Sequence, residues 1–176
     1  DIVLNELDAL QSIDLETRAF KTDFEPLVFV RIGTSGAMQA DIEVNEVIVG
    51  EMALGLDNVP AFYANFDAFN ITAAEMLFYQ EAGWGKNMPR VYFVQADEGL
   101  LAGLGKDYRK GITVSAPGFY GPQGRRLHLP LKDNGLNSKM AEFSYKGLKI
   151  TNYEMESSAL YALAKLMGHK AITLCK

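Results

Sequence analysis

An arginine near the start of the chain stands in an apolar segment just before a short, glycine-flanked turn. The segment covers residues 29–32, and the turn reads GTSG at residues 33–36. Glycines admit backbone angles that point successive N–H groups at one anion, and the hydroxyls of Thr34 and Ser35 add donors. Arg31 offers a rigid fork of donors that matches phosphate oxygens. We therefore predict an anion-binding turn, although a strand followed by GxxG also occurs as a plain connection in α/β proteins.

Two acidic residues lie far downstream, at the start of a long apolar stretch. The sequence there reads NYEMES at residues 152–157 and contains Glu154 and Glu156. Inside a helix these side chains would point in different directions, but at a strand-to-helix junction both can face one cleft. A carboxylate in such a cleft can accept hydrogen bonds from the vicinal hydroxyls of a sugar. The alternative is that both charges only complement the helix dipole and that Met155 only fills the core.

A third segment interleaves aromatic side chains with an amide and guanidinium groups. It reads GFYGPQGRR at residues 118–126. Phe119 or Tyr120 can pack on a planar ring, Gln123 offers both a donor and an acceptor, and Arg125 can donate to a carbonyl oxygen. This combination predicts a site for a heterocyclic base. A solvated surface loop with aromatic anchors is the alternative interpretation.

Helical and strand-like segments alternate along the chain, which predicts an α/β fold. We expect the apolar runs 27–32 and 46–54 to be neighbouring strands of one sheet. Gly168 is expected to end the apolar helix 155–167, and His169 to cap its C-terminus. The remaining segments are expected as helices at 2–10, 72–82, 99–108 and 138–145 and as strands at 90–95, 111–115, 150–153 and 170–175.

Composition narrows the class of protein. The chain has 176 residues, 48% of them hydrophobic, which is enough for the core of one domain. A net charge of -5 argues against a nucleic-acid partner, because binding to a phosphate backbone needs a basic face. Cys175 is the single cysteine, so no disulfide or zinc framework is expected and a reducing cytoplasm fits. The sequence contains no apolar stretch of about 18 residues, so no membrane span is predicted. Residues 1–15 do not resemble a signal peptide.

Taken together, three motifs resemble one enzyme family in order and spacing. FVRIGTSGAMQ at 29–39, FYGPQGR at 119–125 and NYEMESSA at 152–159 resemble the nucleoside phosphorylases of the uridine phosphorylase type. The resemblance spans about residues 27–175 and implies a three-layer α/β/α sandwich around a mixed, partly barrel-like sheet. It also implies one domain over residues 1–176, assembled into a homodimer or a hexamer. Because family members carry a further N-terminal strand region and a C-terminal helix, we expect this chain to be the middle of a longer protein.

The same resemblance implies roles for individual residues. Phosphate would be bound by Arg31 and Thr34. The base would contact Ser35, Gly36, Phe119, Gln123 and Arg125. The ribose would contact Thr34, Glu154, Met155 and Glu156, with Glu156 taking the 2′ and 3′ hydroxyls. Catalysis would depend on Arg31, Gln123, Arg125 and Glu156.

The implied reaction is the reversible phosphorolysis of uridine, or of a related pyrimidine nucleoside, to uracil and ribose 1-phosphate. Inorganic phosphate would be the co-substrate, and no metal or organic cofactor is expected. Three alternatives stay open: a purine nucleoside phosphorylase, a hydrolytic nucleosidase of the same fold, which Arg31 disfavours, and a non-catalytic homologue that binds nucleosides.

Overall fold

A computed structural model describes residues 1–85 and 87–176 of the chain. Its α-helices are α1 (Ile2–Ser12), α2 (Thr72–Glu81), α3 (Glu98–Gly103), α4 (Leu136–Glu142) and α5 (Ser157–Leu166). Short 3-10 helices are η1 (Val59–Phe62), η2 (Phe66–Ala68) and η3 (Gly121–Gln123). The strands are β1 (Val28–Gly33), β2 (Gly36–Ala37), β3 (Ile48–Gly55), β4 (Tyr92–Gln95), β5 (Arg109–Ser115), β6 (Ser144–Tyr145), β7 (Leu148–Glu154) and β8 (Lys170–Cys175).

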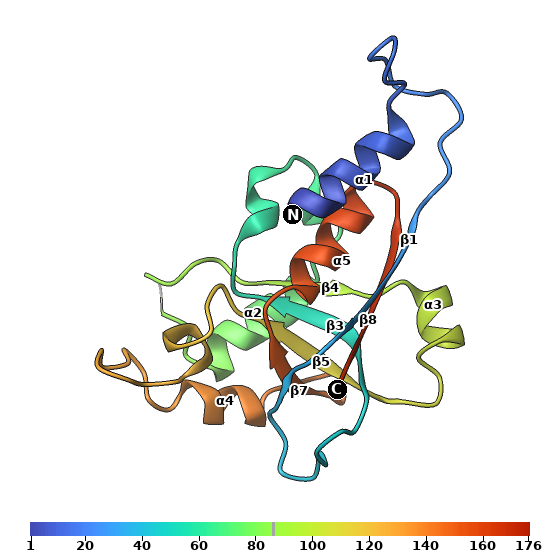
Figure 1. The fold of residues 1–176 in the computed structure, drawn as a ribbon. Coiled ribbons are helices and arrows are strands. Elements are labelled where there is room, and N and C mark those ends of the chain that lie inside the picture. The colour runs from blue at the N-terminus through green and yellow to red at the C-terminus, as the bar shows by residue number, and fades with distance from the viewer. Residues whose placement is uncertain (86) are drawn as a thin grey trace.

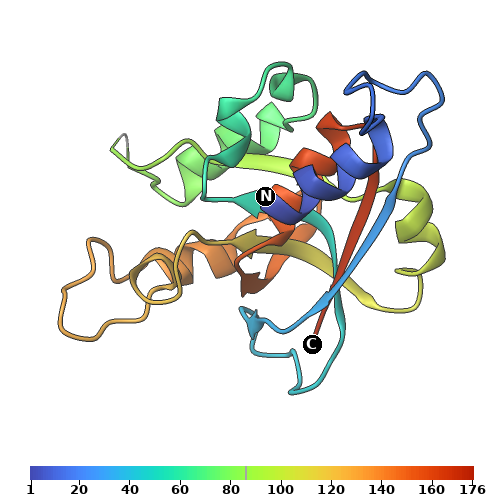
Figure 2. The ribbon, with the colours of Figure 1, turned by 45° about the horizontal axis from the view of Figure 1, so that its top comes forward.

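The strands of the described residues form one mixed, curled sheet. Its order is β1-β8-β3-β5-β7-β2, with β4 paired to β3 and β6 to β7. Strands β3, β5 and β7 are parallel to one another, whereas β8 pairs with β1 in parallel and with the start of β3 in antiparallel. Helices α1 and α5 cover one face and α2 and α4 the other (Figures 1 and 2). The predicted α/β class with helices on both faces of a mixed sheet is confirmed.

One prediction about strand order is wrong. The segments that form β1 and β3 were expected to be neighbours, but β8 lies between them, pairing Val28 with Lys170 at one end and Gly33 with Cys175 at the other. Consecutive strands are often adjacent in a sheet, and that tendency favours a β1–β3 pair. Strand β8 occupies that position, since it pairs along the whole of β1 and with Ile48 and Val49 at the start of β3.

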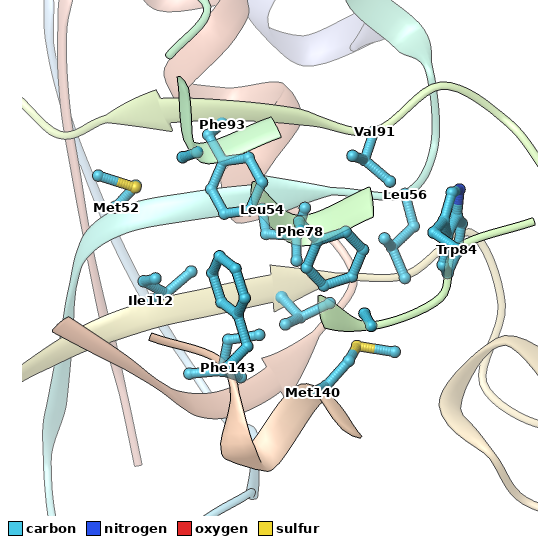
Figure 3. Packing of buried hydrophobic residues seen from close by; sticks show 14 of the residues in the cluster. Met52, Leu54, Leu56, Phe78, Trp84, Val91, Phe93, Ile112, Met140 and Phe143 are labelled. Atoms are coloured by element: carbon cyan, nitrogen blue, oxygen red, sulfur yellow. The ribbon is translucent and has the colours of Figure 1, made fainter. Parts of the chain in front are cut away.

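The face of the sheet under α2 and α4 holds an aromatic core, shown in Figure 3. Phe78 of α2 meets Phe143 at a ring-centroid distance of 5.3 Å and Phe93 of β4 at 5.9 Å, both edge to face. Burying each such ring contributes roughly 1.5–3 kcal/mol. This core fixes α4 against the sheet, and α4 in turn supports the loop before it. Figure 2 shows that loop, between β5 and α4, extending away from the sheet.

The opposite face is built on α5. Tyr161 lies in the middle of this helix and is buried; its hydroxyl donates to the Gly50 carbonyl at 2.7 Å and accepts from the Thr173 amide at 2.8 Å. These two bonds attach α5 to both β3 and β8. The position of the helix start, where the acidic residues lie, is therefore set by the sheet.

The sequence predicts that His169 caps the C-terminus of α5, but its ring does not do so. Its side chain is buried, Nδ1 accepts from the Leu27 amide at 3.1 Å, and Nε2 lies 3.1 Å from Asp8 Oδ1. The ring therefore connects α1 to the chain entering β1.

Among the described residues, no helix is both long and apolar enough to cross a membrane.

Candidate active site

Arg31, near the end of β1, lies beside both acidic residues of the downstream motif. Its Nη1 is 3.4 Å from Glu154 Oε2, and its Nη2 donates to Glu156 Oε2. A Cβ atom at Gly33 would lie 2.5 Å from Arg31 Nη1, so only glycine at that position lets the guanidinium fold back over the turn. Burial opposes the charge of Arg31, but the neighbouring carboxylates outweigh it and raise its pKa above the ordinary value. The guanidinium thus stays charged and is held from two sides.

The GTSG turn is fixed by the sheet edges around it. The Ser35 amide donates to the Lys176 carbonyl at 3.0 Å, and the Ser35 hydroxyl accepts from Asn152 Nδ2 at 3.0 Å. Gly36 pairs with Tyr153 across the β2–β7 ladder, while Thr34 is exposed. The Ser35 amide is therefore occupied by the chain itself, so an anion at this turn would depend on other donors, above all Arg31 and the Thr34 hydroxyl.

The two carboxylates stand at the predicted strand-to-helix junction but in different surroundings. Glu154 ends β7 and its side chain is only 1% exposed, whereas Glu156 precedes α5 and its side chain is 57% exposed. Glu154 Oε2 accepts from the amides of Glu156 and Ser157, each at 2.9 Å. Burial raises the pKa of Glu154, and the hydrogen bond from Ser115, the Glu156 amide and Arg31 oppose that rise. Glu156 therefore faces outward, and Glu154 stands behind it.

The base loop, residues 117–133, is held in part by its own side chains. Arg125 Nη1 donates to the Phe119 carbonyl at 2.8 Å and also to Gln123 Oε1, and its guanidinium carbon lies 4.0 Å above the centre of the Phe119 ring. Gln123 is buried, and its carbonyl accepts from Asn137 of α4 at 3.1 Å. The rings of Phe119 and Tyr120 are exposed, as is Met155. Arg125 and Gln123 thus lie together, next to an exposed aromatic face.

Tyr153 connects this loop to the two other segments. It pairs with Gly36 in the sheet, and its hydroxyl donates to the Pro122 carbonyl at 3.4 Å. A Cβ atom at Gly36 would lie 3.9 Å from Arg125 Nη2, which places the base loop against the turn. The structure therefore brings together the three segments that the sequence singled out.

A cavity of about 910 Å³ lies against the base loop. Its walls are largely apolar and include Leu56, Trp84 and Leu131, together with Tyr120 and Arg125 of the base loop. Arg31 and the two glutamates are not part of its lining. The cavity therefore lies beside the loop of residues 117–133, and Arg31, Glu154 and Glu156, here called the ionic cluster, lie outside it.

Cys175 lies beside the ionic cluster, with its sulfur 3.4 Å from Arg31 Nη1. Burial raises the pKa of this thiol, so it is a neutral neighbour of the guanidinium at physiological pH.

Within residues 1–85 and 87–176, no group of three or more His, Cys, Asp or Glu side chains is arranged to hold a metal ion.

The supporting residues behind Glu154 escaped the sequence reasoning. The Ser115 hydroxyl donates to Glu154 Oε1, and Ser158 Oγ donates to Asp57 Oδ2 at 2.7 Å. Ser115 ends β5 next to the end of β7, with Ser115 and Glu154 in register. Adjacent parallel strands place their carboxyl ends side by side, so the rule points to Ser115 only once the β5–β7 pairing is known.

With this geometry established, comparison with known proteins identifies the family. The sequence model of the Phosphorylase superfamily matches residues 11–175, and the chain belongs to this superfamily. A uridine phosphorylase of Thermococcus kodakarensis is 28% identical over 153 residues, which cover 84% of this chain and 46% of that protein. The chain thus spans about half the length of this curated relative.

Two solved structures share the fold. A Trypanosoma brucei nucleoside phosphorylase, described as showing uridine phosphorylase activity, has a TM-score of 0.82 at 23% identity, covering 99% of this chain and 65% of its own. Isoform 2 of uridine phosphorylase from Schistosoma mansoni, solved with citrate, has a TM-score of 0.60 at 17% identity, covering 99% of this chain and 54% of its own. The curled mixed sheet with its helices is therefore the phosphorylase fold.

Proposed function

We propose that this protein is a nucleoside phosphorylase that acts on uridine or a related pyrimidine nucleoside. One observation carries the proposal: Arg31 contacts both Glu154 and Glu156, while Arg125 of the base loop lies against the same turn. Groups suited to phosphate, to ribose and to a base thus share one side of the molecule. The similarity to the uridine phosphorylase of Thermococcus kodakarensis supports the same reaction.

In this proposal Arg31 and Thr34 bind inorganic phosphate beneath the anomeric carbon of the ribose. The guanidinium is preorganised, because Glu154 and the close approach of Gly33 fix its position. Its Nη2 is engaged by Glu156, whose side chain is 57% exposed. Phosphate can therefore replace Glu156 on Nη2 without disturbing Glu154. Holding the nucleophile in this way converts a bimolecular encounter into a positioned attack.

Glu156 is then released to accept the 2′ and 3′ hydroxyls of the ribose, with Met155 and Thr34 beside the sugar. Its exposure and its place at the start of α5 suit direct contact with a ligand. Glu154 was also expected to touch the ribose. Because both of its oxygens already accept protein hydrogen bonds, we assign it instead to supporting Arg31 and the backbone of Glu156.

The base would lie against Phe119, in contact with Gln123 and Arg125 and bordered by Ser35 and Gly36. In the reaction a phosphate oxygen bonds to C1′ while the N-glycosidic bond breaks, and the bonding electrons leave with uracil as an anion. A positive charge placed on the developing anion lowers the barrier. Arg125 supplies that charge once it exchanges its contacts with the Phe119 carbonyl and Gln123 Oε1 for the base.

This reaction needs no metal or organic cofactor, and it makes the enzyme a glycosyltransferase of pyrimidine salvage. We further propose that the protein works in the cytoplasm, where the buried, unpaired Cys175 stays reduced. We also propose that it assembles as a homodimer or a hexamer, as the family resemblance implies.

The test is turnover of uridine by the intact protein with and without inorganic phosphate, followed by nucleoside absorbance and by ribose 1-phosphate formation. We expect turnover only with phosphate, and faster turnover of uridine than of inosine. An Arg125→Ala variant should lose most of its turnover and keep its melting temperature, whereas Arg126→Ala, at the adjacent exposed position, should behave as wild type. Equal rates in both buffers would instead identify a nucleosidase, preference for inosine a purine enzyme, and no turnover a binding protein.

A further inference from the structure

Ser115 is a fully buried hydroxyl that touches no part of the exposed site. It ends β5, where it lies in register with Gly55 of β3 on one side and with Glu154 of β7 on the other. Its Oγ donates to Glu154 Oε1 and lies 2.9 Å from the backbone nitrogen of Ser158. Ser115 thus connects the buried carboxylate to the first turn of α5.

The direction of these hydrogen bonds follows from counting protons. The Ser158 amide can only donate, so Ser115 Oγ accepts from it. The single hydroxyl proton of Ser115 must then point at Glu154. Ser158 is itself anchored, because its own hydroxyl donates to Asp57 Oδ2 at 2.7 Å and lies 2.9 Å from the Tyr92 hydroxyl. The orientation of the Ser115 hydroxyl is therefore determined by the fold.

Among the described residues, each hydrogen-bond or ion-pair partner of Glu154 offers it a proton donor. Oε1 accepts from Ser115 and from the Ser157 amide at 3.1 Å, while Oε2 accepts from two further amide contacts and faces Arg31. A protonated carboxyl would need an acceptor for its proton. Of these contacts Ser115 Oγ alone has a lone pair, and it could accept only by turning its own proton away from Glu154. The arrangement therefore suits the ionised form, which is also the form that attracts Arg31.

We propose that Ser115 is a positioning residue for the proposed phosphorolysis. It holds Glu154 ionised and in place, and Glu154 in turn holds the Arg31 guanidinium and the backbone amide of Glu156. Ser115 acts only through these groups. The proposal rests on the proposed function for its kinetic consequence, but the behaviour of the Glu154 carboxyl can be measured without any substrate.

Several titratable groups surround Glu154. Arg31 faces it from β1, Cys175 lies on β8 and Glu156 precedes α5, while Tyr92, Tyr161 and Asp57 stand farther back on β4, α5 and the segment after β3. Burial raises the pKa of each tyrosine, and burial also raises the pKa of the Cys175 thiol, so these groups stay neutral in acid.

Ser115→Ala removes one donor from Glu154 and leaves the Ser158 amide without its acceptor. The pKa of Glu154 should rise further, by about one pH unit, as expected for losing one hydrogen bond to a charged group. The acid limb of the pH profile of kcat/KM should move up by the same amount. On that limb, kcat/KM for phosphate at a given pH should fall about tenfold, and it should recover at higher pH.

Tyr161→Phe is the matched control. The Tyr161 hydroxyl is buried, like that of Ser115, and it also accepts one hydrogen bond from a backbone amide. It donates its own proton to the Gly50 carbonyl and not to a carboxylate. Both variants should lose similar stability. Only the Ser115 variant should move the acid limb.

The experiment uses the intact protein with ¹³C-carboxyl-labelled glutamate, the Glu154 signal being assigned by its absence in Glu154→Gln. Titration by NMR gives the carboxyl midpoint, and kinetics give the acid limb. Upward shifts of both in Ser115→Ala, and of neither in Tyr161→Phe, support the proposal. An unchanged Glu154 midpoint in Ser115→Ala, or an equal shift in the control, overturns it.

The experiment still decides if the wild type is inactive or if Ser115→Ala does not fold. If the wild type shows no phosphate-dependent turnover, the proposed function fails, and the NMR midpoint still decides whether Ser115 controls Glu154. If Ser115→Ala does not fold, Ser115→Cys replaces it, since a thiol has similar volume and is a weak donor. The same upward shift is expected of it, and an unchanged midpoint overturns the proposal.

Discussion

Replacing Arg31 with alanine should destabilise the protein in a pH-dependent way. The side chain of Glu154 is 1% exposed, and its Oε2 lies 3.4 Å from Arg31 Nη1. At an effective dielectric constant of about 20, unit charges at roughly this separation attract by about 4 kcal/mol. Removing one partner of a buried pair costs roughly 3–5 kcal/mol, whereas an exposed pair such as Arg31–Glu156 adds about 0–1 kcal/mol. We therefore expect a loss of a few kcal/mol at neutral pH.

The Glu154 carboxyl limits this loss, because it can take up a proton. Its folded-state pKa already lies above the ordinary value, owing to burial, and losing Arg31 raises it further. A folded-state pKa above the unfolded one means that stability is retained in acid and falls as pH rises toward the folded pKa. Between the folded-state pKa values of wild type and variant, the stability difference should grow by up to about 1.4 kcal/mol per pH unit.

Urea unfolding of wild type and Arg31→Ala at several pH values from 5 to 8 measures this difference. The control pair is Glu154→Gln against Arg31→Ala/Glu154→Gln, in which position 154 cannot ionise. We expect the first difference to increase with pH and the second to stay nearly flat. A first difference that is the same at every pH would refute the reasoning, since it would mean that Glu154 does not respond to Arg31.

Three further variants test other parts of the site. Gly33→Ala places a Cβ 2.5 Å from Arg31 Nη1, so it should displace the guanidinium and raise the KM for phosphate about tenfold or more. Gly103→Ala is the control, because nothing lies within 4 Å of its Cβ, and it should leave this KM unchanged. Steady-state kinetics at varied phosphate concentrations measure both. Glu156→Gln should weaken nucleoside binding but change the melting temperature little, because an exposed ion pair contributes about 0–1 kcal/mol; binding calorimetry with uridine and thermal melts measure both. Gly124→Ala places a side chain at a φ of +72° with its Cβ 2.4 Å from an α4 asparagine, and should raise the KM for uridine more than that for phosphate; equal changes in both KM values would contradict a role confined to the base loop.

Much of the fold could be predicted from periodicity and composition. Helix α5 was evident because its apolar residues outnumber its polar ones and Gly168, with a φ of +78°, follows its end. The short strand β2 and the 3-10 turns η1 and η2 were missed, because segments of two to four residues carry too little pattern to recognise. The β1–β8–β3 order was also missed, since pairing between distant segments is decided by packing of the whole sheet.

The candidate site divides in the same way. Arg31 could be chosen because a guanidinium beside a glycine-flanked turn suits an anion, and Glu154 and Glu156 because carboxylates at a strand-to-helix junction suit sugar hydroxyls. The structure places the three in contact. Their different depths could not be predicted. Glu154 and Glu156 have the same chemistry two residues apart, and only the turn from β7 into α5 puts one inside and the other outside. Ser115 was missed because a serine at the end of a strand is unremarkable until its neighbours are known.

The sheet's curl explains why these residues meet. Ser115 and Glu154 end parallel strands, but Arg31 belongs to the β1–β8 pair, which runs opposite to β3 where β8 meets it. In a flat sheet those ends would point apart, and the curl brings them together. Arg31 then has two unlike carboxylates, one buried and held by several hydrogen bonds and the other exposed. In the proposed enzyme this asymmetry couples the substrates: sugar hydroxyls that draw Glu156 away expose Arg31 to phosphate, and phosphate on Arg31 frees Glu156 for the sugar. Because such coupling between two sites is reciprocal, each ligand would favour the binding of the other by the same free energy.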